Sequence, residues 1–144
     1  MSRLIYGISI WGLSINKSPL KKVQRVQNIT MCWVLGLPWW TKTTELLEKL
    51  KWLSIYQLAW YHSLLLIWKV YNINGPTHNF KHLTTRKQNE GRLKLTRRRW
   101  SIRAGKLYQT LPDQIKGAVK LSAAKSLLKE WVKTNIPFEE VEEE

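Results

Sequence analysis

The residues best suited to chemistry are basic, and they cluster between Lys81 and Lys106. Ten Lys and Arg residues in this segment face a single acid, Glu90. Guanidinium groups pair with phosphate oxygens through parallel hydrogen bonds, and an adjacent aromatic ring can stack on an unpaired base. The alternatives are a solvated basic loop and a nuclear localisation patch. We predict phosphate contacts by Arg92, Lys94, Arg97, Arg98, Arg99, Trp100, Arg103 and Lys106.

A smaller basic group, Lys21, Lys22 and Arg25, lies on one side of a predicted helix. This group either adds phosphate contacts or is simply the solvent-exposed side of an amphipathic helix. Over the whole chain, 24 Lys and Arg stand against 10 acids, for a net charge of +14. Five of those acids lie in the C-terminal tail at 139–144. Such an imbalance is tolerated when a polyanion neutralises it, so nucleic acid is the first expected partner and an anionic membrane the second.

Catalytic chemistry is poorly represented. Asp113 is the single aspartate, whereas two-metal phosphoryl transfer needs closely spaced carboxylates. His78 and His82 have the spacing of a helical zinc pair but fall in an irregular segment, where solvated loop histidines are expected. Cys32 is alone, which excludes an intrachain disulfide and predicts a small core residue. We therefore expect no enzymatic activity, no catalytic or metal-binding residue and no cofactor in this chain alone.

The elements that must position the basic residues are helical. Ser18 as N-cap and Pro19 as first residue predict a helix over 19–35, which ends at Gly36 and Pro38. Its predicted apolar face consists of Leu20, Val23, Val26, Thr30, Trp33 and Val34.

Further helices follow. One begins after Thr43 or Thr44, and the next begins at the capping-box pair Ser54 and Gln57 and runs to about residue 72. The latter is apolar nearly all round, which predicts a central, buried helix. Residues 4–15 fit either a helix end or a short buried strand. The aromatic residues spaced along one side of 52–68 are expected to pack in the core; they are Trp52, Tyr56, Trp60 and Trp68.

The second half of the chain begins with a break at 74–76 and a long basic loop over 76–99, with a possible hairpin near 92–95. Helices are predicted from 100 to 108 and from 122 to 134. The fold class is therefore all-α, a small bundle of about four to five helices. We divide it into an N-terminal helical part (1–75), the basic loop (76–99), C-terminal helices (100–136) and an acidic tail (137–144).

Eight short segments in fixed order suggest a family. They are LIYGISIWG at 4–12, KVQRVQN at 22–28, GLP at 36–38, TELLEKLKWLSI at 44–55, LLLIWKVY at 64–71, GRL at 91–93, LPDQI at 111–115 and SLLKEWV at 126–132. Together they resemble the region downstream of the palm in reverse transcriptases of LINE-like (non-LTR) retrotransposons. The resemblance covers nearly the whole chain.

This resemblance implies a helical thumb and C-terminal extension that holds a primer–template. The family's catalytic motif, an aromatic-Ala-Asp-Asp turn, would lie upstream and is absent here, as is the Cys/His zinc knuckle of some relatives. The chain looks like a truncated open reading frame whose Met1 falls inside an ancestral thumb. A separate polymerase palm is then a possible partner.

We therefore expect a non-catalytic fragment that resembles part of an RNA-directed DNA polymerase and grips RNA or DNA without sequence specificity. Its expected location is nuclear or cytoplasmic. One alternative is a membrane-associated protein using helix 55–71, although Gln57 and His62 would be costly in lipid, so a membrane partner is not expected. Another is a protein–protein module or a relic without selected function.

Overall fold

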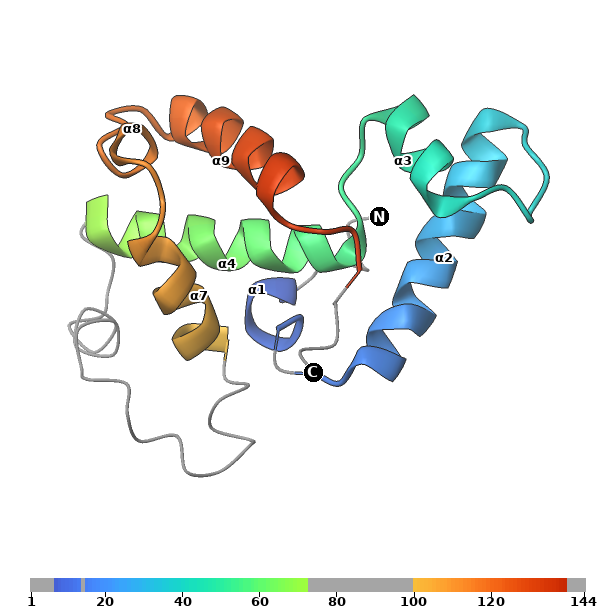
Figure 1. The fold of residues 1–144 in the computed structure, drawn as a ribbon, viewed down its shortest axis with the longest axis horizontal. Coiled ribbons are helices and arrows are strands. Elements are labelled where there is room, and N and C mark those ends of the chain that lie inside the picture. Colours follow the sequence, from blue (N-terminus) through green and yellow to red (C-terminus); the bar gives the residue numbers. More distant parts are fainter. Residues whose placement is uncertain (1–6, 14, 73–99, 140–144) are drawn as a thin grey trace.

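The computed structural model describes residues 7–13, 15–72 and 100–139 (Figure 1). All regular elements in these ranges are helices, which confirms the predicted all-α class. Five have eight residues or more, in agreement with the four to five predicted. The basic loop at 76–99 and the hairpin near 92–95 lie outside the described residues. The helices are α1 (Ile8–Trp11), α2 (Lys17–Leu35), α3 (Thr43–Leu50), α4 (Ile55–Asn72), α7 (Trp100–Gln109), α8 (Asp113–Lys116) and α9 (Leu121–Asn135).

Helix α4 is the centre of the fold, as its apolar composition predicted. Helices α1, α2, α7 and α9 all pack against it (Figure 1). It begins at the predicted capping box: the Ser54 amide donates to Gln57 Oε1 at 3.1 Å, and the Gln57 amide donates to Ser54 Oγ at 3.2 Å. Farther along α4, Trp68 is 2% exposed and its indole N–H donates to the Ile115 carbonyl at 3.0 Å. One core therefore joins residues from both ends of the sequence.

A second, smaller core lies between α2 and α3. Its buried members are Met31, Cys32, Leu46 and Leu47. The burial of Cys32 confirms its predicted role as a small core residue. In Figure 1, α2 and α3 lie at one end of the molecule, whereas α7 and α8 lie at the other.

Two glutamines connect α2 to the start of α4. Gln27 is fully buried, and its amide donates to the Leu53 carbonyl at 2.8 Å. Gln24 Oε1 accepts the Ile55 backbone N–H at 2.8 Å, while its amide donates to Gln27 Oε1 at 2.7 Å. Buried polar groups are stable only when they are hydrogen-bonded, so these contacts fix which side of α2 faces the core.

The predicted apolar face of α2 is wrong in part for that reason. Leu20 is buried and Val23 packs against the main core, as expected, but Val26, Trp33 and Val34 are 47%, 83% and 60% exposed. Hydrophobicity alone places these side chains inward, whereas the hydrogen bonds of the glutamines turn them towards solvent.

The predicted start of α2 is also displaced. The N-cap is Asn16 rather than Ser18, and Pro19 lies at the third helical position. Proline is tolerated there because the first N–H groups of a helix have no partner within the helix. The other end is as predicted, because Gly36 has a left-handed conformation (φ 63°) and ends the helix.

We predict that Gln27→Ala destabilises the fold by about 1–3 kcal/mol, because the buried Leu53 carbonyl loses the amide that donates to it. Urea unfolding followed by circular dichroism measures the change. The matched control is Gln114→Ala, since Gln114 is exposed on α8 and its removal should cost less than about 0.5 kcal/mol. Equal losses in the two variants would show that the buried amide contributes nothing specific.

Candidate nucleic-acid interface

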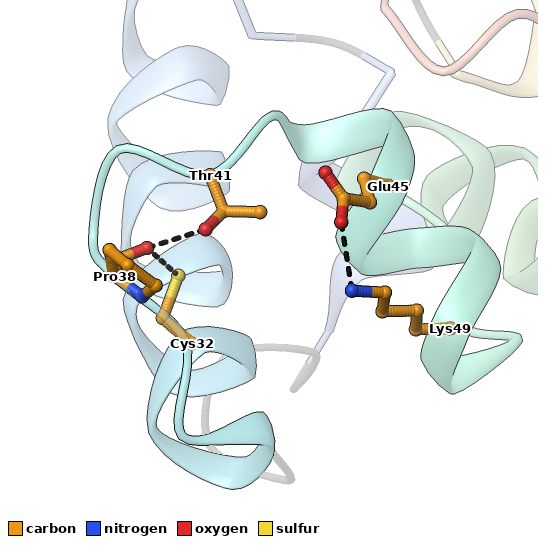
Figure 2. Close-up of polar contacts among 5 residues, drawn as sticks. All are labelled: Cys32, Pro38, Thr41, Glu45 and Lys49. Carbon is orange, nitrogen blue, oxygen red and sulfur yellow. Dashed lines mark hydrogen bonds and ion pairs between the residues drawn. The ribbon is translucent and has the colours of Figure 1, made fainter.

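The described residues carry far more positive than negative charge. Their acids are Glu45, Glu48, Asp113, Glu130 and Glu139, against fifteen Lys and Arg. Lys49 pairs with Glu45 at 2.8 Å (Figure 2), but both side chains are about half exposed, so this i,i+4 pair contributes little to stability. Most of the positive charge is therefore free to act on a partner rather than within the fold.

The predicted binding segment is only partly described. Arg92, Lys94, Arg97, Arg98 and Arg99 lie outside the described residues, and so does the side chain of Trp100, whose backbone opens α7. Lys106 is exposed on α7. The phosphate contacts predicted for these residues therefore stay a prediction.

Arg103 has a contact inside the fold. Its Nη1 donates to the Leu13 carbonyl at 2.6 Å, and its guanidinium lies 5.4 Å from the centre of the Trp60 ring. A partly buried arginine with a hydrogen bond and a cation–π contact braces α7 against α1 and α4. Some of the N–H donors of Arg103 therefore bind within the fold instead of being available to a phosphate. Its position in a basic stretch of sequence does not predict these contacts.

The second predicted basic group is exposed on α2. Within the described ranges, no carboxylate lies within ion-pair distance of Lys21, Lys22 or Arg25. Lys22 and Arg25 share the outward side of α2 with three exposed apolar residues. We call this set the α2 stripe; its members are Lys22, Arg25, Val26, Ile29 and Trp33.

A third basic group, on α9, was missed in the sequence. Lys125, Lys129 and Lys133 are all exposed. Their four-residue spacing places them on one side of the helix, about 6 Å apart along its axis. We call them the α9 lysine row. The four-residue spacing of these lysines is visible in the sequence, although the helix predicted over 122–134 follows from its apolar positions.

The α9 lysine row is close to a further cation on α4. The pKa of His62, on α4, is lowered from its ordinary value of 6.5, first by partial burial and then by the positive charges of Lys69 and Lys125. Lys69 and Lys125 thus act on the same imidazole from two helices. The Lys125 end of the row therefore lies near a cation of the neighbouring helix α4.

An open groove borders the α9 lysine row. It lies between α3 and the end of α9 and has a volume of about 510 Å³. Lys133 is at its edge, and Gln57, which donates to the Ile136 carbonyl at 2.8 Å, closes one side. Leu47 and Trp52 form part of the apolar lining of the groove.

Neither a metal cluster nor a membrane span is found in the described part of the chain. No three His, Cys, Asp or Glu side chains there are grouped so that they can hold a metal ion. No helix there is long and apolar enough to cross a bilayer. Asp113 is an exposed residue in the first turn of the short helix α8.

Comparisons of the chain with protein-family models, with curated proteins and with solved structures find no match.

We predict that the stability of the fold falls as the pH drops through about 6.5. Because the pKa of His62 is lower in the folded than in the unfolded state, the unfolded chain binds more protons in the interval between the two values, and unfolding is favoured there. Urea midpoints at pH 7.5 and 5 measure the effect. His62→Gln should flatten this dependence, with His78 and His82 retained in both proteins. An unchanged pH dependence in the variant would contradict the assignment to His62.

Proposed function

We propose that the chain binds the phosphate backbone of RNA or DNA without sequence specificity and performs no catalysis of its own. The observation that carries the proposal is the α9 lysine row, three exposed lysines on one side of a helix, with Lys69 of α4 near enough to Lys125 for both charges to act on His62. Release of counterions from a polyanion supplies most of the affinity at such a surface.

Lysine chemistry supports backbone contact rather than base reading. An ammonium group is a point charge on a flexible stem, without the fixed fork by which arginine recognises a guanine edge. Phosphate contacts position a protein on nucleic acid but carry no sequence information. The exposed hydroxyl residues Ser122 and Ser126, on the same side of α9, can add neutral hydrogen bonds to phosphate oxygens.

The resemblance to the post-palm region of LINE-like reverse transcriptases agrees with this proposal. On that basis the chain is a non-catalytic thumb-like fragment, and a polymerase palm on a separate chain is a possible partner. A nucleic-acid partner also implies a nuclear or cytoplasmic location.

The first test is the salt dependence of binding. Affinity for a labelled single strand or duplex, measured by fluorescence anisotropy, should fall linearly on a log–log plot against salt, with a slope of about −0.7 to −0.9 per phosphate contacted. The triple variant Lys125→Gln, Lys129→Gln, Lys133→Gln should reduce the magnitude of that slope by about two to three, since each lysine that binds a phosphate contributes roughly one.

The matched control has the same net charge but changes a different helix. It replaces Lys42, Lys49 and Lys51, on and beside α3, with Gln. A similar loss in both triple variants would mean that binding depends on overall charge and not on the α9 lysine row. An affinity that does not respond to salt would contradict the electrostatic proposal altogether.

The predicted basic segment needs its own variant. Replacing Arg97, Arg98 and Arg99 with Gln should also make the slope shallower, by about one for each arginine that binds a phosphate in the parent chain. Combining it with the α9 triple variant shows whether the two groups hold one strand. Additive reductions in slope indicate a shared binding surface, whereas an arginine variant with the parental slope removes this segment from the interface.

A further inference from the structure

The apolar residues of the α2 stripe are exposed and unpartnered among the described residues. Ile29 and Trp33 are 52% and 83% exposed, and Val26 is 47% exposed beside them. Single exposed hydrophobic residues are ordinary, but several on one helix face mark a surface that binds another molecule. Their exposure follows from the hydrogen bonds of Gln24 and Gln27, which hold the opposite side of α2 against α4.

The C-terminal end of the stripe is fixed by the turn that follows α2. In Figure 2 the Pro38 carbonyl accepts hydrogen bonds from Thr41 Oγ1 at 2.7 Å and from Cys32 Sγ at 3.4 Å. The Thr41 amide also donates to it at 3.1 Å. Helix and turn are therefore ordered before any partner binds, which lowers the entropic cost of binding.

The order of residues along the stripe is self-complementary. Its N-terminal half is cationic, with Lys22 and Arg25, and its C-terminal half is apolar and ends in Trp33. If two such helices lie antiparallel, a single register places Lys22 opposite Trp33 and Val26 opposite Ile29 of the second copy. A twofold axis repeats both pairs, as in an isologous interface.

We propose that the α2 stripe binds a second copy of this chain, with the two α2 helices antiparallel. The aliphatic residues of each copy close over those of the other, and each Lys22 ammonium lies on the Trp33 ring of the second copy in a cation–π contact. A parallel arrangement would instead set Lys22 against Lys22 and Arg25 against Arg25, which is repulsive. The charge pattern therefore selects the antiparallel pair.

The stripe is small, so we expect a weak, reversible dimer. An aromatic side chain buries about 150–250 Å². One tryptophan, two half-exposed aliphatic residues and the stems of two cations per copy bury less than specific interfaces do, which average about 800 Å² per partner. Dissociation in the micromolar range is expected for this size.

A lipid surface or a nucleic-acid strand fits the stripe less well. Base stacking accounts for an exposed tryptophan but not for the neighbouring valine and isoleucine. An anionic membrane would attract the cationic half, but it gives no reason for the matched order of cationic and apolar residues. We therefore treat both as outcomes of the test.

The first experiment is sedimentation velocity of the full chain over roughly 1–100 µM, a range that spans micromolar dissociation constants. The expected result is a shift from monomer to dimer that grows stronger with added salt, because salt screens the repulsion between two positively charged chains. Nucleic-acid binding has the opposite salt dependence. A chain that stays monomeric at the highest concentration overturns the proposal.

The matched pair of variants is Ile29→Glu and Val119→Glu. Both positions are exposed, Val119 at 96%, but Val119 lies between α8 and α9, away from α2. Ile29→Glu should abolish the dimer and Val119→Glu should leave it intact, with circular dichroism showing that both proteins are folded. Equal behaviour of the two variants overturns the proposal. So does a monomeric parent whose binding to phosphatidylserine vesicles, or to a labelled oligonucleotide, is lost in Ile29→Glu alone.

Disulfide trapping tests the register. Val26→Cys and Ile29→Cys proteins of different size are mixed and oxidised, and the unaltered chain serves as the background control because Cys32 is only 2% exposed. A disulfide forms only where Cα atoms approach within about 7 Å. The antiparallel register predicts the mixed 26–29 product in excess over either homodimer. A majority of 26–26 and 29–29 products would overturn the antiparallel arrangement.

Discussion

The hydrogen bonds of Gln24 and Gln27 to the backbone at Leu53 and Ile55 are the interaction on which the arrangement of this protein depends. A buried amide that loses its partner costs more than a well-formed pair contributes, so α2 has little freedom to rotate about its axis. This fixed rotation buries Met31 against α3 and directs Trp33 to solvent. The small core at α2–α3 and the free outer face of α2 follow from the same contacts.

The other helices are arranged around α4, which contacts α1, α2, α7 and α9. A helix that is apolar on nearly every side gains most free energy when it is covered on every side. The surrounding helices then turn their charged sides outwards. The α9 lysine row is one such cationic side, and a second positive region lies at the start of α2.

The uses proposed for these surfaces differ because their chemistry differs. The α9 lysine row is purely cationic with hydroxyl neighbours, which suits phosphate oxygens. The α2 stripe combines cations with aliphatic and aromatic residues, which suits a protein surface of matching pattern. Arg103 is a member of neither group, and it contacts Leu13 and Trp60 inside the fold.

Much of the local structure follows directly from neighbouring residues. Ser54 and Gln57 cap each other three residues apart, and Gly36 ends α2, because these interactions are complete within one turn of chain. The burial of Trp60 and Trp68 also follows from spacing. The candidate site was predicted less well. The exposure of Lys21, Lys22 and Arg25 agrees with expectation. The sequence analysis does not include the α9 lysine row, and most of the 92–100 segment lies outside the described residues.

By itself, the sequence determined the helical class, the end of α2 at Gly36, the capped start of α4 and the net charge, since these depend on local hydrogen bonding, periodicity and composition. Only the tertiary structure decided which face of α2 is buried, because the partners of Gln24 and Gln27 come from residues about thirty positions away. It likewise decided that Lys69 and Lys125 act on one histidine and that Arg103 braces α1. Long-range polar pairing of this kind leaves no periodic trace in the chain, because a hydrogen bond depends on where its partner lies in space and not on spacing along the sequence.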